Sequence, residues 1–337
     1  MESKISRTVL TAGAAALAAA AGTVVYRRYR RDLRAAKARV FSGSRMIDTQ
    51  SGPIEFGDVG KGAPVLVIHG AGGGFDQGLE LGRPLIENGF RVIAPSRFGY
   101  LGTPLPQDAT PAAQADAHAR LLDALEVDKV AVVAFSAGAP SAMQFCLRHP
   151  GRCSALVLVV PLAYSPGAEG LAAEDPSRVK GFLLEAMLGS DFAFWTLRKL
   201  ARKAMIKTIL GTPPEDLEQA GAEEEARLEE FLAHIEPVSQ RKKGLKNEAA
   251  IARSLSRYDL ERVETPTLVI GVEDCLYGTY PSARYTAENI PGARFVSYSE
   301  GGHLLVGHTE ELWREIRKFL ANATKPAGQP EELTASR

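Results

Sequence analysis

The chain is poor in cysteine and lacks the common motifs for binding a metal or a nucleotide. Its three cysteines, Cys146, Cys153 and Cys275, form no C-x-x-C pair, and an odd number of cysteines does not make a disulfide framework. Neither H-E-x-x-H nor the phosphate-binding pattern G-x-x-x-x-G-K-[ST] is present. We therefore expect reduced thiols, no metal and no cofactor.

The chain also lacks a net charge, since 40 basic residues balance 40 acidic ones. The balance is not local. Residues 1–40 carry nine Lys or Arg against Glu2 and Asp32, a net charge of +7, so the remainder has a net charge of −7. A mildly acidic main part without a basic patch argues against nucleic acid as a partner.

Charge is absent from residues 8–26, which precede a cluster of arginines at 27–31. As a helix, these 19 residues would span roughly 28 Å, enough for a hydrocarbon core. We predict a transmembrane or signal-anchor helix within 1–26, and the arginines favour a membrane-anchored protein whose catalytic domain is cytoplasmic. Export with a cleaved signal peptide is an alternative, as is a leader that does not insert.

The most informative stretch is 134–138, where Ser136 lies between small residues. The apolar run 129–135 predicts a buried strand and 140–148 predicts a helix, so the serine falls at their junction. A sharp turn there holds the hydroxyl out at the end of a sheet, as in the nucleophile elbow G-x-S-x-G. Ala134 replaces the first glycine but is small enough for close packing.

A glycine-rich loop follows another apolar run, 63–69. Such a loop can turn backbone N–H groups toward an oxygen that gains negative charge during a reaction. We expect the N–H groups of Ala71 and Ala137 to form this oxyanion hole, with Gly72 as a neighbouring donor. Phosphate binding is the competing interpretation, but the glycine spacing does not fit it.

An acid and a histidine follow in the order of a Ser-Asp-His triad. Asp274, with Glu273 as the adjacent alternative, follows the apolar run 265–270, and His303 follows two glycines after the predicted strand 293–298. A serine hydroxyl becomes nucleophilic when a histidine takes its proton, and a carboxylate fixes the tautomer of that histidine. We predict Ser136, Asp274 and His303 as the catalytic residues.

Together these motifs strongly resemble the α/β-hydrolase superfamily over about residues 45–321. The matching pieces, in chain order, are residues 52–56, 69–72, 96–100, 134–138, 271–274, 290–293 and 302–303. The resemblance implies an α/β-hydrolase fold, with a mostly parallel eight-stranded sheet, helices on both faces and an inserted helical cap. The family places its acid three residues after the strand-ending glycine, which selects Asp274 over Glu273.

The resemblance also divides the chain, with a cap between two parts of the core. About a hundred residues without a strand signal predict this cap, in which Phe182, Met187 and Trp195 are candidates to face the substrate or to pack the cap's own interior. The predicted parts are an anchor at 1–26, a basic linker at 27–44, core at 45–161, cap at 162–262, core at 263–321 and a disordered tail at 322–337.

The triad predicts a serine hydrolase that cleaves a moderately hydrophobic carboxylic ester through an acyl-enzyme. The expected partners are a small ester or acyl substrate and, through the N-terminal helix, a membrane. Thioester, C–C, amide hydrolysis or cofactor-free perhydrolysis could use the same triad, since the fold does not fix the substrate. A catalytically silent, membrane-tethered binding protein is an alternative of another class.

Overall fold

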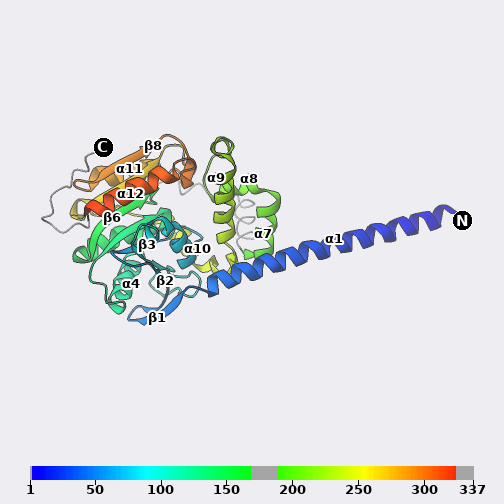
Figure 1. The fold of residues 1–337 in the computed structure, drawn as a ribbon, viewed down its shortest axis with the longest axis horizontal. Coiled ribbons are helices and arrows are strands. Elements are labelled where there is room, and N and C mark those ends of the chain that lie inside the picture. Colours follow the sequence, from blue (N-terminus) through cyan, green and yellow to red (C-terminus); the bar gives the residue numbers. More distant parts are fainter. Residues whose placement is uncertain (1, 168–188, 324–337) are drawn as a thin grey trace, which may run out of the picture.

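A computed structural model describes residues 2–167 and 189–323, and its centre is one eight-stranded sheet (Figure 1). The order across the sheet is β1-β2-β4-β3-β5-β6-β7-β8. The pairs β1–β2 and β2–β4 are antiparallel and all the other pairs are parallel. This confirms the predicted mostly parallel sheet. The strands are β1 (Arg45–Thr49), β2 (Gly52–Val59), β3 (Pro64–Ile68), β4 (Arg91–Pro95), β5 (Val130–Phe135), β6 (Cys153–Val159), β7 (Thr267–Val272) and β8 (Arg294–Tyr298).

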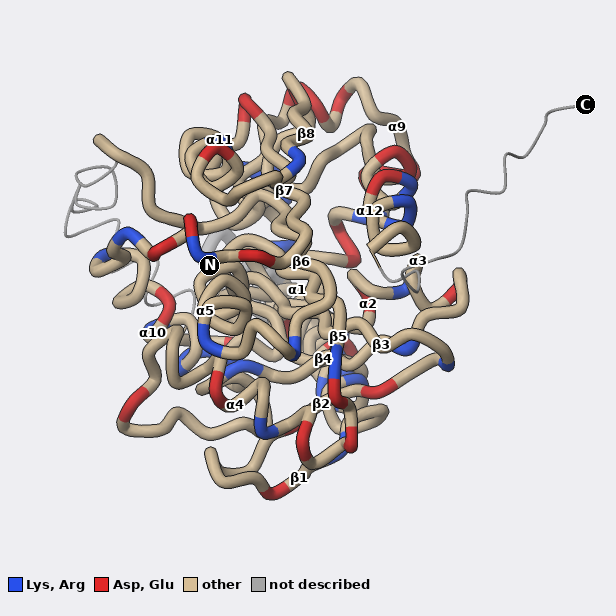
Figure 2. Tube along the Cα trace, turned by 90° about the vertical axis from the view of Figure 1, so that its left-hand side faces the viewer, with Lys and Arg blue, Asp and Glu red and all other residues tan. Residues whose placement is uncertain are grey.

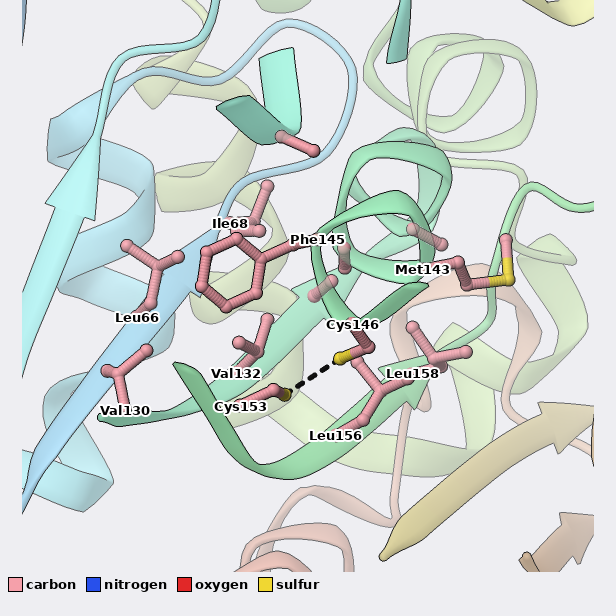
Figure 3. Close-up of a cluster of buried hydrophobic side chains, with 14 of the residues drawn as sticks. Leu66, Ile68, Val130, Val132, Met143, Phe145, Cys146, Cys153, Leu156 and Leu158 are labelled. Carbon is pink, nitrogen blue, oxygen red and sulfur yellow. Dashed lines mark hydrogen bonds between the residues drawn. The ribbon is translucent and has the colours of Figure 1, made fainter. Parts of the chain in front are cut away.

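Helices cover both faces of the sheet, because its central strands are apolar on both sides. Val130 and Val132 of β5 pack against α4, α5 and α11, whereas Ala131 and Val133 point to the face covered by α2, α3 and α12. Figure 3 shows the first of these clusters, in which the free thiols of Cys146 and Cys153 lie next to each other. These helices are α2 (Phe75–Leu81), α3 (Arg83–Ile86), α4 (Pro111–Ala124), α5 (Ala139–Arg148), α11 (Tyr280–Asn289) and α12 (Thr309–Ala323).

The segment predicted as a cap lies between β6 and β7, and its described part is helical. Phe194, Ile206, Leu228 and Leu232 form a buried apolar cluster that Val306, from the segment after β8, also joins. The candidates Phe182 and Met187 lie outside the described residues, as do residues 324–337 of the predicted tail. The cap helices are α7 (Asp191–Leu200), α8 (Arg202–Ile209), α9 (Pro214–His234) and α10 (Lys242–Arg253).

The N-terminal helix α1 (Glu2–Phe41) projects from the body of the molecule and docks on it only near its C-terminal end (Figure 1). Tyr29 contacts the rings of Phe192 and Trp195 in α7, and Ala36 and Val40 are buried. The basic stretch predicted as a linker therefore continues the helix and binds the cap.

The predicted membrane anchor is wrong. Among the residues that the structure describes, no helix combines the length and apolar character needed to cross a membrane. Eight of the 19 residues at 8–26 are alanine, whose small side chain adds little apolar surface, and the same helix runs on into the arginine-rich part that packs on the protein. This finding contradicts the predicted membrane localisation and the transmembrane part of the fold prediction.

Candidate active site

Ser136 occupies a sharp turn at the carboxyl end of the buried strand β5. Its φ of +48° lies in the left-handed region, which is unfavourable for a residue with a side chain. The chain continues through a short 3₁₀ turn at Ser136–Gly138 directly into α5. Backbone strain of this kind persists where the surrounding structure fixes it, and it concentrates at functional sites.

Close packing around the turn explains why its neighbours are small. A Cβ added to Gly138 would lie 2.8 Å from the carbonyl oxygens of Ile68 and His69, and one on Gly70 would lie 3.4 Å from Cβ of Ser136. Ala134 is fully buried. The ends of β3 and β5 therefore nearly touch, and the glycine-rich loop lies beside the serine.

The N–H groups of the predicted oxyanion donors differ in whether another group of the protein already binds them. Ala71 is exposed, and its N–H has no partner among the described residues. The N–H of Gly72 instead donates to the hydroxyl of Tyr100 at 3.3 Å. The carbonyl of Ser136, whose peptide carries the N–H of Ala137, accepts from Leu162 N at 3.0 Å. Ala71 and Ala137 thus remain the better candidates.

His69 fastens the glycine-rich loop to the segment after β4. Its Nδ1 is 2.7 Å from the carbonyl of Gly70, and its Nε2 accepts from the backbone N–H of Arg97 at 3.0 Å. Burial holds the pKa of this imidazole well below its ordinary value. The ring is therefore neutral, with Nδ1 as its donor.

Asp274 follows β7 and binds the loop that carries His303. Its carboxylate accepts from Gly302 N at 2.8 Å and from Gly301 N at 3.3 Å. The neighbouring carboxyl of Asp216, from α9, also accepts from Gly301 N at 3.2 Å. Burial, together with Asp274, raises the pKa of Asp216 to about 6. Glu273 instead accepts from Tyr280.

His303 is buried and lies beside a thiol. Its Nδ1 is 3.2 Å from Sγ of Cys275, its backbone N–H donates to Gly211 O, and its ring meets that of Tyr277 edge-on. Burial lowers the pKa of the imidazole to about 4. A neutral ring can accept a proton at neutral pH, as a general base must.

The three predicted catalytic residues are placed at one edge of the sheet. Ser136 follows β5, Asp274 follows β7 and His303 follows β8, and these parallel strands end on the same side, where ligands bind in such sheets. Within the described residues, no hydrogen bond joins Ser136 to His303 or His303 to Asp274. Asp274 instead binds the backbone N–H groups of the two residues before His303, and Cys275 lies against the imidazole ring of His303.

Of the three cap residues predicted to face the substrate, Trp195 lies among the described residues, and it faces the N-terminal helix. Its Nε1 donates to Asp32 at 3.0 Å, and its ring packs against Tyr29. A cavity that adjoins the turn at Ser136 lies elsewhere, beside α10. This cavity of about 20 Å³ reaches Ala137 and shares part of its lining with a hollow of about 460 Å³ between the start of α4 and α10. The shared residues are Ala109, Pro111, Asn247 and Ile251.

A buried charge network beside the oxyanion loop was not predicted. Arg97 pairs with Glu248 of α10 and donates to the carbonyls of Gly70 at 3.0 Å and Ala137 at 3.1 Å. Tyr100 also donates to Glu248. Residues 96–100 stood out as a family-like motif, but nothing in the sequence marks Glu248 as their partner.

Three side chains near α2 come close enough to share a cation. They are Glu80, Glu230 and His234, the last two on α9. Burial, with a contribution from Arg39, lowers the pKa of His234 to about 4, and the guanidinium of Arg39 donates to the backbone carbonyl of His234. Because this positive charge already lies beside the cluster, we assign it no metal.

Comparison with known proteins places this geometry in a family. The family model "alpha/beta hydrolase fold" matches residues 63–307, so the chain belongs to the α/β-hydrolase fold family. A solved α/β-hydrolase fold protein from Nakamurella multipartita superposes with a TM-score of 0.66 at 28% identity, covering 84% of this chain and all of that one.

Two curated relatives differ in how much of them the chain covers. An uncharacterised hydrolase, YcgS of Bacillus subtilis, is 37% identical over 113 residues, which are 33% of this chain and 39% of that protein. A 2-hydroxy-6-oxo-6-phenylhexa-2,4-dienoate hydrolase of Burkholderia cepacia is 25% identical over 281 residues, 80% of this chain and 91% of that protein.

Proposed function

We propose that this α/β-fold hydrolase cleaves a moderately hydrophobic carboxylic ester through an acyl-enzyme on Ser136. The observation that carries the proposal is the left-handed turn at Ser136, held between β5 and α5 beside the glycine-rich loop. A serine hydroxyl held in that position can attack a carbonyl carbon that lies over the N–H groups of Ala71 and Ala137.

In this mechanism His303 takes the proton of Ser136 as the serine oxygen bonds to the carbonyl carbon. The N–H groups of Ala71 and Ala137 hold the oxyanion of the tetrahedral intermediate. When the intermediate collapses, the leaving alcohol takes the proton from His303. Water, deprotonated by the same imidazole, then attacks the acyl-enzyme and releases the acid and Ser136.

Asp274 orients His303 through the loop that carries it. Its carboxylate binds the backbone N–H groups of Gly301 and Gly302, while the thiol of Cys275 faces Nδ1 of the imidazole. A proton on Nδ1 would point at the sulfur and leave Nε2 as the base. The negative charge of Asp274 would favour the imidazolium that forms during the reaction.

The hollow between α4 and α10 offers a route for part of the substrate, because the cavity that adjoins it reaches Ala137. Its lining mixes apolar side chains such as Leu105 and Ile251 with polar ones such as Gln144 and Asn247. This mixture suits a moderately hydrophobic group that carries an oxygen, as in many small-molecule sites.

Hydrolysis of a C–C bond beside a ketone is the second candidate. It is favoured by the similarity to the 2-hydroxy-6-oxo-6-phenylhexa-2,4-dienoate hydrolase over 80% of this chain. A ketone carbonyl would take the place of the ester carbonyl over the same N–H groups, and the leaving group would be a carbon stabilised by conjugation.

The test is hydrolysis of p-nitrophenyl esters from acetate to laurate by the parent and by Ser136→Ala, with a 6-oxo-dienoate as the ketone substrate. We expect ester turnover that falls by about 10³- to 10⁶-fold in the variant. Cleavage of the ketone alone would select the second candidate. Labelling by a fluorophosphonate without any turnover would point to a thioester or amide.

Absence of both turnover and labelling would leave a protein without serine hydrolase chemistry. Ser282→Ala is the matched control. Ser282 is a buried serine on α11 whose hydroxyl donates to Pro161 O, so its loss tests whether removing any buried serine hydroxyl reduces the rate.

A further inference from the structure

Arg97 is a buried cation that has no role in the reaction proposed above. It follows β4 and is 5% exposed. Its Nη2 donates to the carbonyl of Gly70 at 3.0 Å and its Nη1 to the carbonyl of Ala137 at 3.1 Å. One guanidinium therefore ties the glycine-rich loop to the residue after the serine.

The carbonyl of Gly70 belongs to the same peptide group as the N–H of Ala71. Because a peptide group is planar and conjugated, a cation bound at its oxygen both fixes its orientation and draws electrons from its N–H. Charge-assisted hydrogen bonds are stronger than neutral ones, and linked hydrogen bonds polarise one another. The N–H of Ala71 should therefore be a better donor to an oxyanion.

The contact with Ala137 serves the second donor. Fixing the carbonyl of Ala137 restricts rotation of the residue that carries the other N–H. Leu162 N already holds the carbonyl of Ser136, on the other side of that N–H.

Glu248 and Tyr100 hold the guanidinium in place. The carboxylate of Glu248, from α10, binds Nη2 of Arg97 and accepts from the hydroxyl of Tyr100. Tyr100 in turn accepts from Gly72 N, and the guanidinium lies 5.4 Å from the centre of its ring. All three side chains are buried, so each charge needs its partner.

We propose that Arg97 is a positioning residue that orients and polarises the backbone donors of the oxyanion hole, and that Glu248 of the cap segment sets its position. The inference rests on the proposed function, because it assigns a role in stabilising the oxyanion of Ser136 chemistry. It also makes the donor geometry depend on where α10 lies.

The test uses the full chain with Arg97→Lys and with the double variant Arg97→Met, Glu248→Met. The double variant leaves no buried charge unpaired, and lysine keeps the charge but cannot bind both carbonyls in the bidentate geometry of arginine. We expect kcat on p-nitrophenyl acetate to fall by about 10- to 100-fold with KM nearly unchanged, which is less than the about 10²- to 10³-fold cost of removing one oxyanion donor outright. The lysine variant should lie between the double variant and the parent.

A thionoester substrate separates positioning from general damage to the fold. Sulfur accepts hydrogen bonds poorly, so an oxyanion hole favours the ester over the matching thionoester. If Arg97 acts through the donors, the variants lose most of that preference. Equal losses on both substrates, or a rise in KM alone, would overturn the proposal.

Two controls distinguish the possible failures. Arg91→Met removes an arginine at the start of β4 that pairs with Asp58, and we expect it to keep the parent's kcat and ester preference. If the parent does not turn over esters, or Ser136→Ala keeps the rate, the proposed function fails. If both behave as expected and the folded Arg97 variants match the parent, only the role of Arg97 fails.

Discussion

The interior of the sheet and the interface between core and cap are held by different kinds of contact. Around β3, β5, β6 and β7, buried side chains are almost all apolar and interlock on both faces. Where the core meets the cap, ion pairs are buried as well. Asp76 of α2 binds Arg241 before α10 and Arg39 of α1, and Arg97 binds Glu248.

Because of this difference, the charged interface and not the sheet interior fixes where the cap lies relative to the site. Apolar burial is nondirectional, so the sheet interior stabilises the scaffold without fixing one cap position. A buried ion pair is stable only when each group finds its partner. Arg241 also donates to the carbonyl of Gly73, and Arg97 to that of Gly70. The charged interface thus connects the cap to the oxyanion loop.

The largest expected loss of stability comes from Asp76→Leu. This change leaves the guanidinium of Arg241, which is fully buried, and that of Arg39 without their carboxylate. Removing one member of a buried pair costs about 3–5 kcal/mol. Urea unfolding, followed by circular dichroism, measures the change in free energy of unfolding.

The double variant Asp76→Leu, Arg241→Met removes the stranded charge and should recover much of that loss. If Asp76→Leu alone is as stable as the parent, the ion pair between Asp76 and Arg241 does not stabilise the fold. Although burial opposes ionisation of Asp76, Arg241 and Arg39 lower the pKa of its carboxyl. Its contribution is present above the ordinary Asp pKa and is lost as pH falls through the lowered value.

A smaller loss is expected in the sheet interior from Leu158→Ala on β6. Leu158 is fully buried, and such truncations cost about 2–5 kcal/mol because they leave a cavity. Leu158→Met should cost less than about 1.5 kcal/mol, since similar volume is tolerated in a core. The matched control is Leu200→Ala, since Leu200 is 81% exposed.

Asp76→Asn separates the effect of charge from the effect of shape at the interface. Asparagine matches aspartate in size, yet it cannot neutralise two guanidiniums. If Asp76→Asn is tolerated as well as Leu158→Met, shape rather than charge holds the interface, and the contrast between the two regions disappears. Thermal unfolding at pH 7 of Asp76→Leu, Asp76→Asn, Leu158→Ala and Leu158→Met measures the four losses of stability.

Much of the scaffold could be predicted because its signals are local. The apolar runs at 63–68, 129–135 and 265–270 became β3, β5 and β7, and the small residues around Ser136 became the tight turn. Each depends on neighbours in the chain, where burial and steric limits act directly on the residues concerned.

The contacts that position the site could not be predicted because they join distant residues. Arg97 and Glu248 are 151 positions apart, and Trp195 and Asp32 are 163 apart. A single charged residue in a helical pattern, such as Glu248, predicts a solvent-exposed side chain. The docking of α1 was missed for the same reason, because Arg39 of the predicted basic linker binds Asp76, 37 positions further along the chain.

The smallest expected effect comes from Asp216→Asn, at a point where core and cap bring like charges together. Asp216 lies on α9, whose sequence holds eight acidic residues, and acidic residues are drawn red in Figure 2. Asp216 faces Asp274 beside Gly301, and Glu300 adds negative charge. Burial, then Asp274, raises the pKa of Asp216 to about 6. The stability linked to this carboxyl is therefore present below its ordinary pKa and is lost as pH rises through about 6.

Asparagine stays uncharged, so the variant should equal the parent below the ordinary Asp pKa, exceed it slightly at pH 5 and exceed it most at pH 8. Because the pair is partly exposed and screened by solvent, we expect a gain below about 1 kcal/mol that shrinks as salt is added. Thermal unfolding at both pH values measures it, with Asp48→Asn on the exposed side of β1 as control. The same gain at pH 5 and pH 8 would mean that Asp216 is ionised throughout, and that the contact between cap and His303 loop does not depend on a shared proton.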